Sequence, residues 1–386
     1  MKNIVVLGAT GSIGQSAAKV ARDIPQRMRI VGLSAHRNLA KLEELAEQFP
    51  EATLCITDAA SPTPGALGNC RKVLRGEEGL LELATLPEAD MVLIAIVGIG
   101  GLRPALAAIE AGKDIAIASK EILVMAGEIV MEAARRKGVN VLPVDSEHNA
   151  IFQCLEGRDP AHVRRLILTA SGGPFRTAPA ESLESVTPAQ ALKHPTWNMG
   201  AKITIDSATL FNKGLEMIEA RWLFNVEMAR IDVVVHPQSI VHSMVEFVDS
   251  SVLAQLSHSD MCFPIQYAVT WPERVPNTLP PLDFAQLARL EFEAPRCDVF
   301  PALDLARHAG ETGGTLPAVF NAANEIAVAA FLKHRLSFPG IWKTVAAVME
   351  AHRAVAHAPL DAIVEADHWA RARAAEQIAK LCAAGK

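Results

Sequence analysis

The stretch Leu7-Gly8-Ala9-Thr10-Gly11-Ser12-Ile13-Gly14 (residues 7–14) decides the fold of the first part of the chain. A short apolar run, 3–7, leads into it, and a helical pattern follows at 14–23. Glycines at this spacing permit a tight turn, and the free N–H groups at a helix start attract a pyrophosphate. The G-x-x-G-x-x-G spacing is less specific than G-x-G-x-x-G, so a glycine turn that serves only helix–sheet packing remains the alternative.

The first 145 residues alternate β-branched runs with helical patterns, which predicts βαβ units on a parallel sheet. We expect strands at 3–7, 29–34, 91–96, 114–118 and 139–144, and helices at 14–23, 38–49, 101–111 and 120–137. The fold class is therefore α/β, and residues 1–145 are predicted to form a Rossmann-type nucleotide-binding domain.

A different pattern follows, and it predicts two further domains. We expect an α+β domain over 146–275, with strands at 166–170, 202–206, 231–235, 241–248 and 251–257, a hairpin turn at 249–251, and helices near 188–193 and 214–224. A Pro-rich stretch predicts a linker at 276–296. The Ala-rich block 297–386 has helical periods and predicts a C-terminal helical domain.

Composition excludes several classes of protein. Of 386 residues, 50% are hydrophobic and 21% charged, as in globular proteins. The net charge of −6 provides no basic field for nucleic acid. The longest apolar run, 91–101, is shorter than the roughly 20 residues that a bilayer requires. Because the N-terminus reads as a first strand, we expect a cytoplasmic protein without a membrane segment. Six cysteines without C-x-x-C pairs predict inert thiols.

The end of the second predicted strand indicates which dinucleotide binds. NAD-preferring folds place Asp or Glu there for the ribose 2′-hydroxyl. This chain has Ser34-Ala35-His36-Arg37-Asn38, with no carboxylate and one permanent cation. A 2′-phosphate suits Arg37, so NADP(H) is favoured over NAD(H); a solvated surface arginine is the alternative.

Acidic residues cluster at two places. Asp145 and Glu147 follow the strand 139–144, and in an extended segment residues i and i+2 share a face. Glu216 and Glu219 are three apart near the start of a helix and share a face there. Oxygen ligands without a nearby cysteine suit Mg²⁺ or Mn²⁺. On spacing alone, a solvated acidic edge is nearly as good an interpretation.

Other polar groups suit an anionic substrate such as a phosphomonoester. They follow predicted strands and are Lys120, Ser171, Ser207, Asn212 and Lys213. The segment 194–200 contains Trp197 but shows no periodicity, which favours a lid over substrate. We expect His236 and His242 to be structural.

Eight motifs distributed over nearly the whole chain carry a resemblance to a known family. They are LGATGSIG (7–14), SKE (119–121), PVDSEHNAIFQCL (143–155), TASGGPFR (169–176), HPTWNMG (194–200), DSATLFNKGLEMIEA (206–220), HPQSIVHSMVEF (236–247) and NAANEIAVAAF (321–331). In these motifs the chain resembles the 1-deoxy-D-xylulose 5-phosphate reductoisomerase family.

The resemblance implies a homodimeric enzyme that uses NADPH and Mg²⁺, Mn²⁺ or Co²⁺ to convert 1-deoxy-D-xylulose 5-phosphate to 2-C-methyl-D-erythritol 4-phosphate. It implies the metal ligands Asp145, Glu147 and Glu216. These three and Lys120, the candidate for proton transfer, would be catalytic. The implied substrate residues are Lys120, Ser146, Glu147, Ser171, His194, Trp197, Ser207, Asn212, Lys213 and Glu216, and the implied NADPH residues are Thr10, Gly11, Ser12, Ile13, His36, Arg37, Asn38, Ser119, Glu121 and Gly200.

Two positions depart from the family pattern. Ser119 replaces the usual Asn, which predicts a shorter or water-mediated cofactor contact. Ala35-His36-Arg37 stands where the family often has Gly-Lys, so binding of the 2′-phosphate would depend on Arg37.

Two rival functions remain at this level. A metal-free Rossmann dehydrogenase of the semialdehyde or homoserine type would keep the dinucleotide site and use Asp145 and Glu147 structurally. An NADP(H)-sensing protein without turnover would need an output surface, and the sequence shows no basic recognition helix.

Overall fold

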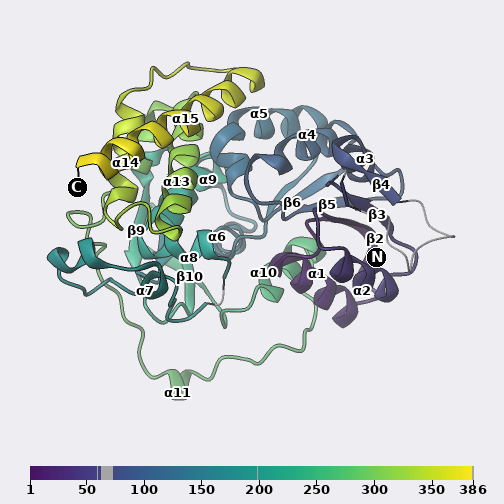
Figure 1. The fold of residues 1–386 in the computed structure, drawn as a ribbon. Helices are drawn as coiled ribbons and strands as arrows, with labels where there is room; N and C mark the ends of the chain where they lie inside the picture. The colour runs from purple at the N-terminus through teal and green to yellow at the C-terminus, as the bar shows by residue number, and fades with distance from the viewer. Residues whose placement is uncertain (59, 62–72, 198, 385–386) are drawn as a thin grey trace. The chain divides into compact units, whose positions relative to one another are not determined.

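The computed structural model describes residues 1–58, 60–61, 73–197 and 199–384 (Figure 1). The chain divides into two compact units. Unit 1 comprises Met1–Ile122, Val130–Asn149 and Asp260–Pro281, and unit 2 comprises Leu123–Ile129, Ala150–Ser259 and Leu282–Lys386. Both units are therefore discontinuous in sequence.

Within the described residues, unit 1 contains a seven-stranded parallel sheet with the order β4-β3-β2-β1-β5-β6-β7. Its strands are β1 (Lys2–Leu7), β2 (Met28–Ala35), β3 (Thr53–Ile56), β4 (Val73–Arg75), β5 (Met91–Ile94), β6 (Asp114–Ile117) and β7 (Val141–Pro143). The strand order changes direction after β1. The carboxyl ends of β1 and β5 therefore flank the switch point at which open α/β sheets bind ligands.

Helices connect these strands. They are α1 (Ser12–Asp23), α2 (Leu39–Gln48), α3 (Gly76–Ala84), η2 (Gly98–Gly101), α4 (Leu102–Glu110), α5 (Glu121–Lys137), α6 (Ser146–Leu155) and α10 (Cys262–Thr270). Two of them, α5 and α6, contribute residues to both units. Residues 4–7 of β1 and 91–94 of β5 are completely buried, as expected for central strands covered on both faces.

The predicted α/β, Rossmann-type class is confirmed. Each predicted strand and helix of this region is present, with ends shifted by a residue or two. The sequence reading missed β3, β4 and α3. Between β3 and β4, residues 62–72 lie outside the described part of the chain.

Unit 2 contains a mixed sheet with the order β11-β10-β8-β9. Its strands are β8 (Val163–Ala170), β9 (Ile231–Val235), β10 (Val241–Phe247) and β11 (Val252–Leu256), and only the β8–β9 pair is parallel. The predicted hairpin turn is confirmed. Ser250 has φ +66°, and Phe247 N–H donates to Ser251 O at 2.9 Å.

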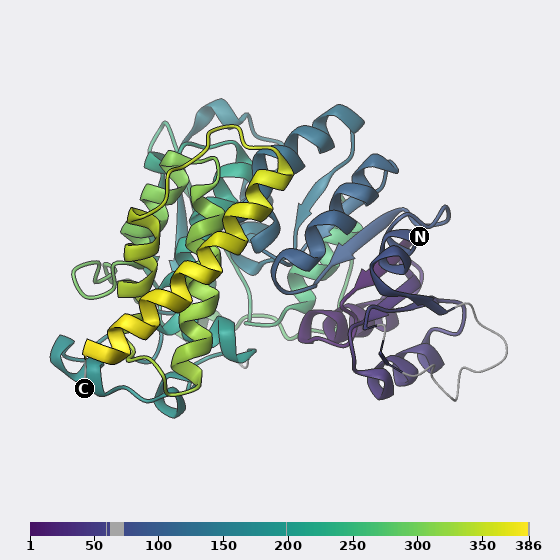
Figure 2. The same cartoon turned by 45° about the horizontal axis from the view of Figure 1, so that its top comes forward.

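Helices supply most of the core of unit 2. They are η3 (Pro160–His162), η4 (Ala180–Ser185), α7 (Pro188–Ala191), α8 (Ala201–Ala208), α9 (Phe211–Phe224), η5 (Met228–Arg230), α11 (Phe284–Leu287), α12 (Ala302–Thr312), α13 (Leu316–Leu332), α14 (Gly340–Glu350) and α15 (Leu360–Ala384). Figure 2 shows the long α15 running along α13, where Arg371 pairs with Glu325 at 2.7 Å. Phe211 and Phe320 pack with ring centroids 5.3 Å apart, so α9 and α13 share one core.

The predicted strand at 202–206 is wrong, because these residues belong to α8. The run Lys202-Ile203-Thr204-Ile205-Asp206 alternates like a half-buried strand, but Thr204, Ile205 and Asp206 are all buried. Tertiary contacts of Asp206 outweigh the β-propensity of the run. Its carboxylate accepts one hydrogen bond from Asn324 Nδ2 at 2.8 Å and lies 2.5 Å from Lys202 Nζ.

The two units group the chain differently from the predicted domain boundaries. Residues 260–281 were assigned to the central domain and the linker, but they belong to unit 1, where α10 packs on α1. Residues 282–386 belong with 150–259, because α12 and α13 pack on α9. The functional division into nucleotide, catalytic and helical parts remains a prediction.

None of the helices in the described part of the chain is both long enough and apolar enough to cross a membrane.

Candidate functional site

The glycine turn after β1 brings two backbone segments too close for side chains. A Cβ atom at Gly8, which has φ +86°, would lie 2.5 Å from Ala95 O. A Cβ atom at Gly14 would lie 2.2 Å from Ala9 O, where α1 packs on the turn. Gly11 is the N-cap of α1 and has no side chain to cap it. The first N–H groups of α1 are therefore open to an anion, as a pyrophosphate site requires.

Side chains after β2 contact the loop after β3. His36 Nδ1 lies 2.9 Å from Thr57 Oγ1, and Arg37 Nε donates to Asp58 Oδ2 at 3.1 Å. Asn38 Oδ1 accepts from Lys41 N–H at 3.2 Å and so caps α2. The sequence reading found no carboxylate at the end of β2, and it missed Asp58 at the end of β3.

Ser119 follows β6 and is buried. Its hydroxyl donates to Ile96 O at 2.5 Å. This bond ties the end of β6 to the end of β5, so the Ser119 hydroxyl has a structural role in the free protein. The neighbouring Glu121 begins α5 and is also buried.

Lys120 and Asp145 form a buried ion pair at the ends of adjacent strands. Lys120 follows β6, Asp145 follows β7, and Nζ lies 2.8 Å from Oδ2. Burial raises the pKa of Asp145, but the charges of Lys120 and His148 and the hydrogen bonds of Glu147 and Lys120 together lower it more. The pKa of Asp145 therefore lies well below the usual range. Removing one partner of such a pair costs about 3–5 kcal/mol. Asp145 is therefore ionised at neutral pH.

The segment after Asp145 is helical, which corrects the extended geometry that we predicted. Asn149 N–H donates to Asp145 O at 2.8 Å, and α6 begins at Ser146. Glu147 lies in the first turn of α6 and accepts a hydrogen bond from Ser146 Oγ at 2.7 Å. The helical conformation is stabilised over an extended one by Asn149, which is buried and whose side-chain amide donates to Pro143 O at 2.9 Å.

Three charged residues of α9, Lys213, Glu216 and Glu219, are buried, and Asn212 beside them is half-buried. Asn212 Nδ2 donates to Glu216 Oε1 at 2.5 Å, and Lys213 Nζ forms an ion pair with the same carboxylate. Glu219 is completely buried one turn later. Leu210, the N-cap of α9, has φ +64° and turns the chain sharply between α8 and α9. This turn separates Ser207 on α8 from Asn212 and Lys213 on α9.

Ser171, His194 and Ser207 form a polar cluster within unit 2, the serine–histidine cluster. His194 Nε2 lies 3.0 Å from the hydroxyl oxygens of both serines, which are 3.3 Å from each other. Gly173 N–H donates to Ser171 Oγ at 3.2 Å. Ser171 follows β8, as predicted, whereas Ser207 lies in α8 and not after a strand.

The tautomer of His194 follows from its other ring nitrogen. Nδ1 accepts the backbone N–H of Thr196 at 3.2 Å and of Trp197 at 3.0 Å. Nε2 of the neutral ring therefore carries the proton and points it at the two serines. Burial lowers the pKa of His194 below its ordinary 6.5, so the ring is neutral at pH 7. The cluster thus presents hydroxyl and imidazole donors, which suit a phosphate.

The described residues of 194–200 have neither helical nor strand structure, in agreement with the missing periodicity. Trp197 is half-buried, with its ring centroid 6.4 Å from that of His242. Asn198 lies outside the described residues. Gly200 is the N-cap of α8, and its carbonyl accepts from Thr204 Oγ1 at 2.9 Å. Whether the segment closes over substrate remains a prediction.

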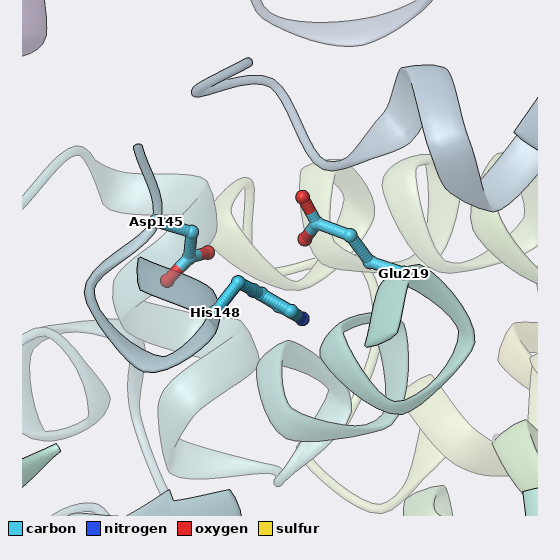
Figure 3. Close-up of side chains that lie close together, drawn as sticks. All are labelled: Asp145, His148 and Glu219. Atoms are coloured by element: carbon cyan, nitrogen blue, oxygen red, sulfur yellow. The ribbon is translucent and has the colours of Figure 1, made fainter. Parts of the chain in front are cut away.

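Two sets of side chains have the donor chemistry to hold a metal ion. One is Asp145, Glu147 and Glu216; the other is Asp145, His148 and Glu219. Figure 3 shows the carboxylate of Asp145 just before α6, the His148 ring in its first turn, and Glu219 on α9. The sequence reading did not include His148 or give Glu219 a metal role.

His236 and His242 have the hydrogen-bonded rings that we expect of structural residues, and the structural role itself stays a prediction. His236 Nδ1 lies 2.7 Å from Glu291 O, and its Nε2 accepts from Ile240 N–H at 3.2 Å. His242 Nε2 lies 3.2 Å from Ser257 O. Burial lowers the pKa of His242 to about 4, so its ring is neutral.

Three family models together match most of the chain. The family described as 1-deoxy-D-xylulose 5-phosphate reductoisomerase matches residues 4–127. Its C-terminal domain matches residues 141–224, and the DXP reductoisomerase C-terminal domain matches residues 256–373.

Curated relatives share about half of the sequence. A 1-deoxy-D-xylulose 5-phosphate reductoisomerase from Pelotomaculum thermopropionicum is 51% identical over 96% of this chain and 97% of its own length. One from Symbiobacterium thermophilum is 53% identical over 98% of this chain and 100% of its own length.

Solved structures have the same fold. The reductoisomerase from Zymomonas mobilis in complex with NADPH superposes with a TM-score of 0.89 at 42% identity, covering 98% of this chain and 99% of that one. A DOX-P reductoisomerase in complex with NADPH, fosmidomycin and magnesium gives 0.90 at 40% identity, covering 99% of both chains. The predicted fold class, enzyme class and family are thereby confirmed. The chain belongs to the 1-deoxy-D-xylulose 5-phosphate reductoisomerase family.

Proposed function

We propose that this enzyme isomerises and reduces 1-deoxy-D-xylulose 5-phosphate to 2-C-methyl-D-erythritol 4-phosphate, a step of non-mevalonate isoprenoid biosynthesis, with NADPH and a divalent metal ion. Family membership along the whole chain is the observation that carries this proposal. The matched ranges 4–127 and 141–224 contain every candidate residue of the cofactor, metal and substrate sites.

The glycine turn after β1 supports the NADPH assignment. Its backbone leaves no room for a Cβ at Gly8 or Gly14, so a pyrophosphate can approach the main chain and the start of α1. Two solved relatives are complexes with NADPH. In our assignment, Thr10, Gly11, Ser12 and Ile13 hold the pyrophosphate, His36, Arg37 and Asn38 hold the 2′-phosphate side, and Ser119, Glu121 and Gly200 line the remainder.

Asp145, Glu147 and Glu216 are our proposed metal ligands. Their oxygen donors suit Mg²⁺ or Mn²⁺, and solved relatives include three complexes with magnesium. The lowered pKa of Asp145 keeps it an anionic ligand at neutral pH. A bound divalent ion would polarise the substrate carbonyl and stabilise negative charge on neighbouring oxygens.

The serine–histidine cluster, with Asn212 and Lys213 of α9, supports a phosphate site. The cluster supplies three donors, and Lys213 supplies a buried positive charge. A phosphate far from the reacting carbons provides binding energy for orientation. In our assignment Trp197 closes over the substrate and Ser146 contacts its other end. Lys120, beside Asp145, holds or moves a proton at the reacting oxygens.

We also propose that the enzyme is a homodimer. β11 is the edge strand of the described sheet in unit 2, and the side chains of Val252 and Leu253 there are exposed. Such an edge pairs readily with another strand, and a two-fold axis would pair β11 with its own copy. Leu253→Lys would then shift the sedimentation coefficient toward the monomer. A cytoplasmic location remains our prediction.

The proposed function is tested by assaying metal-free enzyme with 1-deoxy-D-xylulose 5-phosphate and either NADPH or NADH. We expect NADPH oxidation only after Mg²⁺, Mn²⁺ or Co²⁺ is added. Turnover that survives a chelator would favour the metal-free dehydrogenase. NADPH binding without any turnover would favour the sensor protein.

A further inference from the structure

The chain segments after β2 and β3 continue side by side beyond the ends of these strands. Thr57 N–H donates to Ala35 O at 3.0 Å, and Asp58 N–H donates to His36 O at 3.2 Å. These bonds extend the parallel pairing of Ala35 with Ile56. Asp58 is thereby held beside the segment that carries Arg37.

The carboxylate of Asp58 is fixed and charged. It accepts hydrogen bonds from Ser61 Oγ at 3.2 Å and from Ala60 N–H at 3.4 Å. Burial raises the pKa of Asp58. These hydrogen bonds and the Arg37 charge together lower it by more, so the pKa is below its ordinary value. Its side chain is 20% exposed, whereas that of Arg37 is 73% exposed.

The contact between the two side chains uses only one edge of the guanidinium. Nε of Arg37 donates to Asp58 Oδ2 at 3.1 Å. Among the described residues, Nη1 and Nη2 form no hydrogen bond, so they are available to a phosphate. Any anion that they bind lies about 6–8 Å from the Asp58 carboxylate, because a guanidinium spans only a few ångströms.

Building on the proposed NADPH site, we propose that Asp58 is a specificity-determining residue that lowers the preference of this enzyme for NADPH over NADH. Two effects act in this direction. The carboxylate repels the 2′-phosphate of NADPH by about threefold in affinity at physiological salt. Without the 2′-phosphate, the ribose of NADH can lie nearer to Asp58 than that of NADPH. The carboxylate can then accept a hydrogen bond from the 2′-hydroxyl, which is the role of an acidic residue in NAD-preferring folds.

One effect opposes these two. Asp58 orients Arg37, so losing the carboxylate altogether would leave the guanidinium less ordered. An exposed ion pair contributes little to such order. Asn at position 58 would still accept the Arg37 Nε hydrogen bond. Asp58→Asn therefore isolates the charge, whereas Asp58→Ala removes the charge and the orientation together.

The experiment measures equilibrium dissociation constants of NADPH and NADH by nicotinamide fluorescence, without substrate, for the wild type and three variants. We expect Asp58→Asn to raise the NADPH/NADH affinity ratio about fivefold, and the gain in NADPH affinity to shrink as salt increases. Asp58→Ala should raise the ratio less. Glu51→Gln removes an equal charge before β3, at its opposite end, and should leave the ratio unchanged.

An unchanged or lower ratio in Asp58→Asn would overturn the proposal. The cofactor site itself is tested separately by Arg37→Ala, which should weaken NADPH at least tenfold and leave NADH nearly unaffected. If the wild type did not bind NADPH, the proposed cofactor and the role of Asp58 would both be rejected.

Discussion

The candidate dinucleotide region in unit 1 and the candidate substrate region in unit 2 meet their ligands with different parts of the chain. The glycine turn offers backbone N–H groups, and its geometry depends on the absence of side chains at Gly8 and Gly14. The substrate region offers side chains, namely the serine–histidine cluster and the buried polar residues of α9. The first region is therefore sensitive to added atoms, and the second to lost functional groups.

Replacing Glu216 with Gln should have the largest effect. The substitution keeps the shape of the side chain but removes a carboxylate charge from the proposed metal site. We expect turnover to fall at least about 1,000-fold, as for groups that act on the reacting atoms. Isothermal titration should show weaker Mn²⁺ binding, whereas the NADPH dissociation constant should stay near wild type. Unchanged activity would remove Glu216 from the metal site.

Gly14→Ala tests the candidate dinucleotide region. Its Cβ would meet the Ala9 backbone at 2.2 Å, and backbone cannot swing aside, so α1 must shift. We expect a loss of about 1–3 kcal/mol in unfolding free energy and NADPH binding weakened about tenfold or more. Gly11→Ala is the matched control, because its Cβ would lie 3.4 Å from Gly8 O and should leave the melting temperature unchanged. Equal stability of the two variants would contradict the steric argument.

The two ring nitrogens of His194 have different hydrogen-bond partners, and two substitutions can test them separately. Asn can still accept the N–H groups of Thr196 and Trp197 but cannot reach the serines, whereas Gln keeps a donor toward the serines. We expect His194→Asn to raise KM for the phosphosugar about tenfold, and His194→Gln to raise it less and lower kcat. The reverse order would contradict the derived tautomer.

The same ring predicts a pH dependence. Because burial lowers the pKa of His194, the folded state binds its proton less well than the unfolded state. Its stabilising contribution is complete above about 6.5, the unfolded value, and is lost as the pH falls through the lower folded value. A proton on Nδ1 would oppose the two backbone N–H donors. KM should therefore rise in acid for the wild type, and this rise should be smaller in His194→Asn.

Trp197→Ala should have the smallest effect. The ring is half-buried in a segment without regular structure, so its loss should change the melting temperature little. We expect KM to rise or kcat to fall several-fold through poorer exclusion of water. Trp197→Phe should recover part of the loss. A large decrease in melting temperature would instead place Trp197 in the core.

The two units also differ in how much of their structure the sequence could predict. In unit 1 the candidate residues follow strands, and continuous apolar runs identify buried strands well. The positions of Lys120 and Asp145 at the ends of β6 and β7 were therefore predicted correctly. The short strands β3 and β4 gave no comparable signal, and Asp58 was missed with them.

In unit 2 the candidate residues lie on helices whose pattern the sequence obscures. The run 202–206 alternates like a strand, yet it is helical because Asp206 is buried against Asn324 from α13. No local pattern reveals a partner more than a hundred residues away. The motif at 321–331 was the available signal, and its Asn324 would have pointed to a buried polar contact.

The return of residues 260–281 to unit 1 has a consequence for synthesis on the ribosome. α10 packs on α1, although residues 123–129 and 150–259 of unit 2 lie between the two helices in the sequence. Nascent domains usually fold as soon as they leave the exit tunnel, beginning with the N-terminal one. Here the last strand of the sheet ends at Pro143, but α10 ends only at Thr270. The early form of unit 1 would therefore wait with the face of α1 that α10 covers still exposed, at risk of capture by chaperones or by other nascent chains.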